Sequence, residues 1–295
     1  MKGISIDKPV FIVGTGRCGS TIFFKLLSHH PKVCWHSTLE HKYPNSRLIG
    51  VKSRFINRDP FYSLCKQIIS NFKPTEIWDI WGKADPGFVE PCRALNAEDV
   101  SESNRKKFID IVSKKVARSG DNRFTAKLTG WSRIPYLKEI FPDAVFVHVL
   151  RDGRAVANSL LHVDFWSGWN GIHNWRWGYK DEYFKIFEKY DESFAVLAGL
   201  QWKILVDEIE NEGRNLKKSD FMTIRYEDLM DKPLNVMRDV CSFLDLSYTK
   251  KFDKKISNYN LRNMNYKWKE NLTSIEKQKL NDFLQEDLRK YGYIK

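Results

Sequence analysis

The sequence is poor in several features that mark whole classes of protein. Its five cysteines are widely spaced and include no Cys-x-x-Cys pair, which favours reduced thiols over a disulfide framework or a zinc site. The amino terminus lacks the apolar stretch of a signal peptide. The longest apolar helical stretch, residues 194–206, contains Gln201 and Lys203 and is too short to cross a bilayer. These absences favour a cytoplasmic protein without a transmembrane segment.

Charge of one sign is in excess but is not concentrated. The chain has 49 Lys and Arg against 37 Asp and Glu, a net charge of +12, yet it contains no run of five or more like charges. A positive field attracts anions in general, so the charge alone does not choose between nucleic acid, acidic lipid and nucleotide phosphate. The scattered distribution argues against a basic tail, and we expect no nucleic-acid partner.

Short apolar stretches alternate with stretches of helical periodicity along the chain. With 295 residues, 42% of them hydrophobic, the protein can bury a large core. Such alternation predicts an α/β fold, a three-layer sandwich with a central parallel sheet similar to that of P-loop NTPases, in a single domain of residues 1–295. The predicted strands are residues 9–13, 33–35, 123–128, 145–150 and 221–225, and the predicted helices are residues 20–29, 62–71, 102–118, 134–141, 153–161, 194–211, 234–244 and 274–291.

Residues 37–122 are less regular than the rest. We interpret them as a helical or loop insertion, with a loop at residues 73–96.

The most informative segment is residues 14–21, Gly-Thr-Gly-Arg-Cys-Gly-Ser-Thr, between the first predicted strand and helix. Its glycines have the spacing of a P-loop, in which backbone N–H groups and a helix N-terminus hold an anion. Ser20 stands where a nucleoside-triphosphate enzyme has its lysine, and Arg17 supplies a cation inside the loop instead. The alternative is a glycine-rich turn that only connects strand to helix. We predict a phosphate site, with no metal, formed by Gly16, Arg17, Cys18, Gly19, Ser20 and Thr21.

A second candidate anion site follows the strongest predicted strand, residues 145–150. Arg151 comes directly after this strand, where open α/β sheets bind ligands, and Ser159 lies about two helical turns further on. The alternative is a surface turn in which Arg151 or Arg154 pairs with Asp152. Two anion sites at neighbouring strand ends indicate a nucleotide that carries separated phosphates.

These motifs resemble those of the sulfotransferases that use 3′-phosphoadenosine 5′-phosphosulfate (PAPS). Residues 14–21 are similar to the 5′-phosphosulfate loop of this family, in the arginine-bearing form of protein-tyrosine and many bacterial sulfotransferases. Residues 147–159 are similar to its 3′-phosphate motif, which implies that Arg151 and Ser159 are phosphate ligands. The resemblance implies PAPS as the donor and adenosine 3′,5′-bisphosphate as the product.

Two further motifs extend the resemblance toward the carboxyl terminus. Residues 224–229, Ile-Arg-Tyr-Glu-Asp-Leu, match a third family motif, which implies that Tyr226 lies near the nucleotide. Residues 266–270, Tyr-Lys-Trp-Lys-Glu, resemble the loop that folds over the cofactor and imply Lys267 and Trp268 as contacts.

Sulfuryl transfer needs cations where the leaving phosphate gains charge and a base for the acceptor proton. Arg17 and Lys127 are the candidate cations, with an exposed strand-end lysine as the alternative reading of Lys127. His36, Glu40 and Glu76 are the candidate bases, and the two carboxylates are favoured. Aromatic neighbours make Glu76 suitable for base work.

The sequence leaves the acceptor open. A small molecule, a lipid or a glycan that offers a hydroxyl or amine would fit, and residues 37–122 would shape its site. The Trp cluster at residues 166–177 is interpreted as packing rather than as an acceptor pocket. Two other functions compete: a P-loop nucleotide kinase, which would need a lysine at position 20 and Mg²⁺, and a non-catalytic module that binds polyanions.

Overall fold

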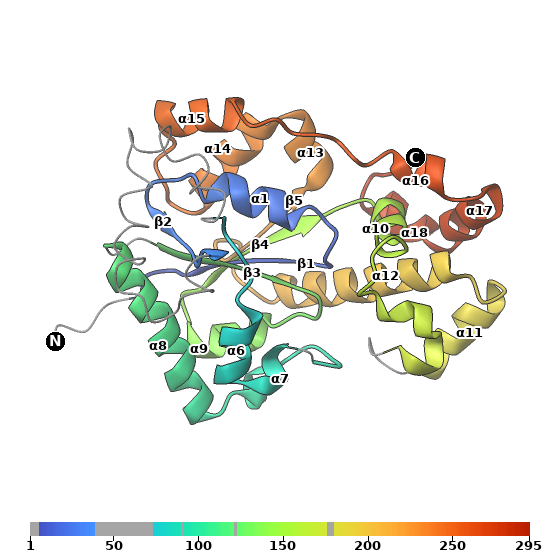
Figure 1. The fold of residues 1–295 in the computed structure, drawn as a ribbon, viewed down its shortest axis with the longest axis horizontal. Coiled ribbons are helices and arrows are strands. Elements are labelled where there is room, and N and C mark those ends of the chain that lie inside the picture. Colours follow the sequence, from blue (N-terminus) through green and yellow to red (C-terminus); the bar gives the residue numbers. More distant parts are fainter. Residues whose placement is uncertain (1–5, 39–72, 90, 121–122, 176–179) are drawn as a thin grey trace.

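A five-stranded parallel sheet forms the centre of the molecule (Figure 1). The computed structural model describes residues 6–38, 73–89, 91–120, 123–175 and 180–295. The strand order β2-β3-β1-β4-β5 places β1 between β3 and β4, and every pairing is parallel. The strands are β1 (Val10–Gly14), β2 (Val33–Cys34), β3 (Arg123–Thr129), β4 (Val145–Leu150) and β5 (Phe221–Arg225).

Both faces of the sheet are buried, because alternate side chains of β1 enter different cores. Phe11 and Val13 pack into one core with residues from the helices on that face, while Val10 and Ile12 pack into another on the opposite face. In Figure 1, α1, α13, α14 and α15 lie above the sheet, and α6, α8 and α9 lie below it. The predicted α/β sandwich with a central parallel sheet is therefore confirmed.

The helices that cover the sheet connect successive strands or extend the chain beyond them. Three short 3₁₀ helices, η1 (Ala97–Asp99), η2 (Ser167–Asn170) and η3 (Ile172–Asn174), occur between them. The α-helices are α1 (Ser20–Leu27), α6 (Trp78–Ala84), α7 (Pro86–Val89), α8 (Glu102–Ser119), α9 (Ile134–Ile140), α10 (Gly153–Leu160), α11 (Asp181–Lys189), α12 (Phe194–Arg214), α13 (Tyr226–Asp231), α14 (Pro233–Phe243), α15 (Lys250–Ser257), α16 (Lys267–Asn271), α17 (Ser274–Phe283) and α18 (Gln285–Lys290).

Two of the predicted elements were wrong in kind or extent. Residues 73–96 were expected to form a loop, but they contain α6 and α7. These helices pack against residues that are distant in sequence: the ring of Trp81 stacks on the ring of Phe108 in α8, with 5.1 Å between ring centres. The single helix predicted at residues 274–291 is broken at Leu284. Leu280, Leu284 and Leu288 are all fully buried, so the apolar pattern runs on through the break. The helix predicted at residues 62–71 lies outside the described residues.

The sheet register places the two candidate anion sites at one edge. Gly14 at the end of β1 pairs with Thr129 of β3, and Ile12 pairs with Lys127. On the other side of β1, β4 ends at Leu150, directly before Arg151. The carboxyl ends of β1, β3 and β4 therefore meet, as in other open parallel sheets that bind ligands there.

A helix that spans a bilayer must be both long and predominantly apolar. None of the helices in the part of the chain that the structure describes is long and apolar enough to span a bilayer.

A buried carboxyl group lies behind the loop that follows β3. Ser132 donates a hydrogen bond from its hydroxyl to Glu212 of α12, whose side chain is buried. Burial raises the pKa of Glu212 to about 7. The folded protein therefore holds this proton where the unfolded chain, with an ordinary carboxyl pKa, has already lost it.

Glu212→Gln is expected to make the protein less sensitive to rising pH. Because the folded-state pKa of Glu212 is raised, its contribution to the free energy of unfolding is complete below the ordinary carboxyl pKa and is lost as the pH rises through about 7. Above about pH 8 the variant should be more stable than the parent, by on the order of 2 kcal/mol. Denaturant unfolding at several pH values measures this.

The exposed Glu286 of α18 provides the matched control. Glu286→Gln should leave the pH dependence of stability as in the parent. If both variants follow the parent curve, the raised pKa of Glu212 is refuted.

Candidate active site

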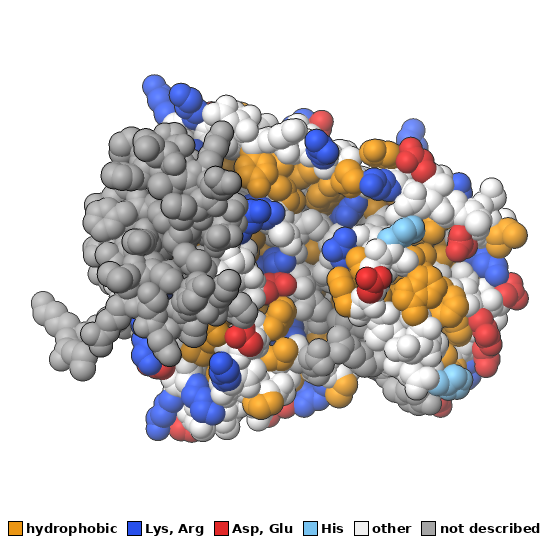
Figure 2. All heavy atoms as spheres, viewed as in Figure 1, with side chains coloured by type: hydrophobic (Ala, Val, Ile, Leu, Met, Phe, Trp, Pro, Cys, Tyr) orange, Lys and Arg blue, Asp and Glu red, His pale blue; other side chains and the backbone are white. Residues whose placement is uncertain are grey.

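A cleft of about 1080 Å³ opens at the carboxyl edge of the sheet. Figure 2 shows Lys and Arg side chains gathered in the hollow at the centre of this face. The cleft is bordered by the loop after β1, the end of β3, one side of α10 and the segment before α16. The predicted site residues that line it are Gly16, Arg17, Gly19, Ser20, Thr21, Glu76, Lys127, Arg151, Ser159, Tyr226 and Lys267.

The glycine-rich loop curls in the way that an anion cradle requires. Gly16, Arg17 and Gly19 have φ values of 77°, 53° and 92°, and α1 begins directly after them at Ser20. The first amide groups of the helix thus lack partners within the helix and are available to a ligand. The side chain of Cys18 is buried among core residues, so only its backbone can take part in binding.

Gly19 is also required by its neighbour. A Cβ atom at this position would lie 2.3 Å from Cδ2 of Tyr226, closer than any real side chain allows. Tyr226 is the first residue of α13, which follows β5. The motif at residues 224–229 therefore packs directly against the glycine-rich loop at residues 14–21, which we call the phosphate loop. The two motifs are far apart in sequence and form one wall of the cleft.

A lysine and a glutamate lie together beside this loop. Lys127 of β3 donates from Nζ to Oγ1 of Thr21 at 2.7 Å, and the same Nζ lies 3.2 Å from Oε1 of Glu76. Thr129, two residues further along the same face of β3, donates to that carboxylate oxygen at 3.2 Å. The structure therefore joins a candidate base, a candidate cation and the phosphate loop in one chain of contacts.

Positive charge accumulates around this group. Burial, together with the charges of Lys73 and Lys127, lowers the pKa of Lys25, which also lines the cleft. Cations that crowd one another favour an anion in the same space, since its charge offsets their repulsion.

Arg133 is a site residue that the sequence analysis missed. Its guanidinium group is buried and donates to the backbone carbonyls of Phe88, Val89 and Trp131. Burial lowers the pKa of Arg133 to about 10, and the charge of Glu76 opposes this shift. These contacts tie the end of α7 to the loop after β3, the strand that carries Lys127. An arginine within a short polar loop gives no signal in the sequence that would reveal this role.

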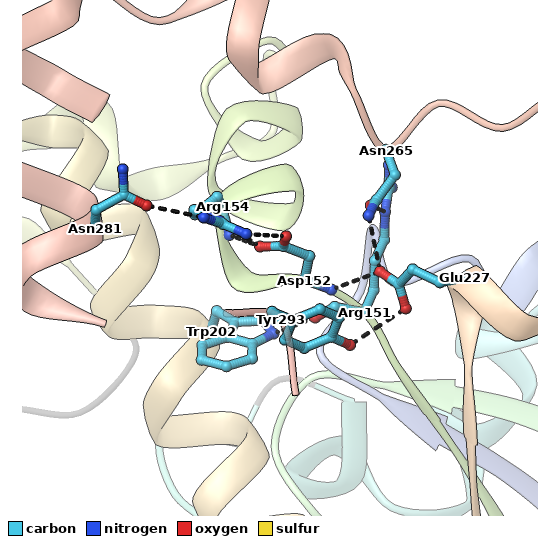
Figure 3. Close-up of polar contacts among 8 residues, drawn as sticks. All are labelled: Arg151, Asp152, Arg154, Trp202, Glu227, Asn265, Asn281 and Tyr293. Atoms are coloured by element: carbon cyan, nitrogen blue, oxygen red, sulfur yellow. Dashed lines mark hydrogen bonds and ion pairs between the residues drawn. The ribbon is translucent and has the colours of Figure 1, made fainter. Parts of the chain in front are cut away.

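Arg151 joins the phosphate loop to the segment before α16, and Figure 3 shows it beside Asn265 of that segment. It donates from Nη1 to the carbonyl of Arg17 at 2.9 Å, from Nη2 to the carbonyl of Met264 at 3.1 Å and from Nε to Oδ1 of Asn265 at 3.0 Å. Its guanidinium carbon lies 4.4 Å from the centre of the Tyr226 ring. The side chain is only 7% exposed, and burial lowers the pKa of Arg151.

The two predicted anion sites share residues. Nε of Arg17, in the phosphate loop, donates to Oγ of Ser159 on α10 at 2.9 Å. Ser159 and Arg151 were expected to serve a second phosphate, and both of them contact Arg17. The two candidate sites are therefore in direct contact through Arg17.

A carboxylate network supports this arrangement from behind. Oε1 of Glu227 accepts from the backbone N–H of Asp152 at 3.0 Å and from Nδ2 of Asn265 at 2.9 Å, while the Tyr293 hydroxyl donates to Oε2 at 3.3 Å. Burial raises the pKa of Glu227. The sequence analysis missed Asn265 and Tyr293, because only the fold brings these two residues, both distant in sequence, to the end of β4.

Arg154 behaves differently from Arg151. It forms two hydrogen bonds with the carboxylate of Asp152, at 3.0 and 2.7 Å, and one with Oδ1 of Asn281 at 3.0 Å. The ion-paired turn weighed as an alternative thus applies to Arg154, while Arg151 remains in the cleft. Trp268, expected beside the nucleotide, lies under the guanidinium group of Arg154 at 4.3 Å and is not among the residues that line the cleft.

The structure separates the three candidate bases. Glu76 lines the cleft beside the phosphate loop. The ring of His36 packs edge-on against Phe124 of β3, with 5.9 Å between ring centres, and His36 is not among the lining residues. Glu40 lies outside the described residues.

Two further observations concern cleft chemistry. Asn158 of α10 is buried and lines the cleft, and its Oδ1 has no hydrogen-bond partner among the described residues, so a ligand donor could pair with it. The sequence analysis passed over it, although it is the residue before Ser159. Among the described residues, no group of three or more His, Cys, Asp or Glu side chains is placed to hold a metal ion.

The tryptophan cluster has mainly a packing role in the part that is described. Trp166 and Trp175 are buried, and both donate from Nε1 to Oε1 of Gln201. Trp169 is 48% exposed, and Trp177 lies outside the described residues.

Comparisons with known proteins agree on one family. Residues 9–250 match the family model described as "Sulfotransferase family". The chain is 24% identical, over 308 aligned positions, to the omega-hydroxy-beta-dihydromenaquinone-9 sulfotransferase of Mycobacterium bovis, covering 97% of this chain and 76% of that protein. It is 28% identical over 116 residues to protein-tyrosine sulfotransferase A of Caenorhabditis elegans, covering 39% of this chain and 25% of that protein.

Solved structures show the same fold. A crystal structure of a sulfotransferase from Mycobacterium avium has a TM-score of 0.56 and 16% sequence identity, covering 97% of this chain and 77% of that chain. A sulfotransferase from Mycobacterium tuberculosis H37Rv has a TM-score of 0.52 and 13% identity, covering 95% of this chain and 77% of that chain.

The glycine pair in the phosphate loop provides a test of the cradle. Gly16→Ala and Gly19→Ala both place a side chain at positive φ, but only the second drives a Cβ into the Tyr226 ring. Gly19→Ala should weaken binding of adenosine 3′,5′-bisphosphate by about 100-fold, and Gly16→Ala by about tenfold or less. Titration calorimetry measures both, with Tm as the check on folding. Equal losses would contradict the contact between the loop and Tyr226.

Proposed function

The chain belongs to the sulfotransferase family and is an enzyme that transfers a sulfuryl group from PAPS to an acceptor, and we propose that Arg17, Lys127 and Glu76 carry out this transfer. The family expected from the motifs is confirmed, and the kinase and polyanion-binding alternatives lose their support. The observation that carries the proposal is the position of Lys127 Nζ, in contact with both Thr21 of the phosphate loop and the Glu76 carboxylate.

The cleft residues fit a nucleotide with phosphates at both ends. The loop at residues 14–21 would hold the 5′-phosphosulfate, and Arg151 with Ser159 would hold the 3′-phosphate. Tyr226 fills the space that a side chain on Gly19 would occupy, and Lys267 borders the same cleft. When bound, PAPS supplies an electrophilic sulfuryl group on a phosphate leaving group.

The cations act where negative charge grows. Arg17 lies inside the phosphate loop, and Lys127 contacts the hydroxyl of Thr21 at the start of α1. Both can stabilise charge on the departing phosphate oxygen, and they do so in a cleft whose walls already hold them in place. The side chain of Lys127 is 11% exposed, so water weakens its field less than at the surface.

Glu76 receives the acceptor proton in this proposal. Its side chain is 24% exposed and borders the cleft, so an acceptor hydroxyl can reach it. Lys127 and Thr129 hold one carboxylate oxygen, and no hydrogen bond to the other oxygen is seen among the described residues. Arg133 fixes the segment that follows Glu76, because it anchors the end of α7 to the loop after β3.

We propose an acceptor with an apolar body and a hydroxyl group. Apolar side chains line part of the cleft, and polar groups that also line it, Asn158 and Gln201 among them, can orient one hydroxyl. The named substrate of the Mycobacterium bovis relative is an omega-hydroxylated dihydromenaquinone, which has this character. The apolar residues that line the cleft include Trp78, Val89, Pro91, Trp131, Leu160 and Phe165.

Replacing the proposed base should separate chemistry from binding. Glu76→Gln is expected to lower kcat by about 100-fold, because the amide cannot take the acceptor proton, while the Kd for adenosine 3′,5′-bisphosphate stays within about threefold. Single-turnover sulfate transfer and calorimetry give the two values. Asp79→Asn changes an exposed carboxylate three residues further on and should leave both values unchanged. A normal kcat for Glu76→Gln would remove this residue from the mechanism.

The arginines at the start of α10 form a second matched pair. Arg151→Ala should weaken binding of adenosine 3′,5′-bisphosphate by about 100-fold, because a buried cation facing the phosphate is lost. Arg154→Ala breaks the pair with Asp152 and should lower Tm while changing that Kd by no more than about threefold. Calorimetry and thermal unfolding distinguish the two effects. If Arg154→Ala costs as much affinity as Arg151→Ala, the assignment of the 3′-phosphate site is wrong.

A further inference from the structure

Large apolar side chains are exposed on two sides of the cleft opening. Of the seven large hydrophobic residues that are exposed in the described part of the chain, two, Phe165 and Met264, line the cleft itself. Three others, Trp169, Phe194 and Tyr266, lie close to these two in the chain or pack near them. We call these five residues the cleft rim. Figure 2 shows a large group of hydrophobic side chains beside the hollow, over the segment between α10 and α11.

The aromatic rings of the rim are held in place from below. Trp169 packs edge-on against Trp166, with 5.3 Å between ring centres, and lies 5.1 Å from Phe194. Trp166 is buried and bonded to Gln201, which itself lines the cleft. Phe165, the residue before Trp166, is 70% exposed. The ring of Trp169 is therefore held against the buried Trp166, whose partner Gln201 belongs to the cleft wall.

Cations accompany these apolar groups. Arg262 and Lys267 are exposed, line the cleft and flank Met264 and Tyr266 in the chain. The chain as a whole has a net charge of +12. Aromatic rings beside Lys and Arg are the combination that suits the boundary between acyl chains and anionic head groups, where each type finds its own environment.

We propose that the cleft rim docks on an anionic lipid bilayer, so that the acceptor reaches Glu76 directly from the membrane. This rests on the proposed function, since an apolar acceptor with one hydroxyl group resides in such a bilayer. Docking places the opening of the cleft at the lipid surface, so that the acceptor hydroxyl enters while its apolar body stays among lipids or cleft-wall residues. The binding of lipid is carried by rim residues, and the chemistry by residues deeper in the cleft.

Vesicle binding tests the proposal without turnover. Sedimentation with phosphatidylcholine vesicles that contain about 30% phosphatidylglycerol should recover the parent protein, and vesicles of phosphatidylcholine alone should recover much less. Binding should fall as salt is raised, because head-group attraction is screened. Failure of the parent to bind the mixed vesicles overturns the proposal.

Variants of the rim make the test specific. Trp169→Ser and Tyr266→Ser change two sides of the rim, neither residue lines the cleft, and each should weaken vesicle binding by about tenfold. Ile109→Ser removes an exposed apolar side chain from α8, on a different part of the molecule, and should bind like the parent. Equal binding by all three variants would show that the rim is not the contact.

Two more measurements separate this proposal from its premise. The Kd for adenosine 3′,5′-bisphosphate should be unchanged in Trp169→Ser, and the Tm of both Trp169→Ser and Tyr266→Ser should stay close to that of the parent, which shows that the variants fold. If the parent transfers sulfate to a soluble aliphatic alcohol but does not bind vesicles, docking is wrong and the proposed function stands. If sedimentation velocity shows a dimer that Trp169→Ser dissociates, and vesicles are not bound, the rim is an interface between two copies and the docking proposal is also overturned.

Discussion

The cleft depends on one buried guanidinium group. Arg151 contacts the phosphate loop through the carbonyl of Arg17, and the segment before α16 through Met264 and Asn265. All three acceptors are neutral oxygens, so within the described residues these hydrogen bonds orient the positive charge without cancelling it. The nearby carboxylates of Glu227 and Asp152 favour the cation without bonding to it, and an anionic ligand in the cleft offsets more of the cost of burying it. The same side chain thus assembles three distant segments and makes the assembled cleft selective for an anion.

Local backbone chemistry explains why much of this site could be predicted from the sequence. A glycine-rich loop between a buried strand and a helix can adopt few conformations, and the positive φ values of Gly16 and Gly19 are those that such a loop requires. Arg151 was found because it directly follows the strongest strand, and parallel strands end at a common edge. The fold class followed in the same way from alternating buried strands and helices.

Contacts distant in sequence explain what could not be predicted. The choice between Glu76, His36 and Glu40 depends on where the chain crosses the sheet edge before α6, which Trp81 and Arg133 fix through partners elsewhere in the chain. Trp268 lies in the expected segment, but Arg154 determines the direction in which its ring is buried. A sequence motif gives the position of a residue in the chain. The direction of its side chain depends on packing against residues distant in sequence, which the local sequence does not show.

The contact between the two anion sites has a consequence for ligand choice. Arg17 holds an unfavourable φ of 53° while its carbonyl accepts from Arg151 and its guanidinium donates to Ser159. A nucleotide with a phosphate at only one end would fill one site and leave the cation of the other without an anion. A nucleotide with phosphates at both ends satisfies Arg17 and Arg151 together, so binding at each end stabilises the geometry needed at the other. Under the proposed assignment of Arg17 to the 5′-phosphosulfate and of Arg151 to the 3′-phosphate, the position of Arg17 between Arg151 and Ser159 therefore favours a 3′,5′-substituted nucleotide.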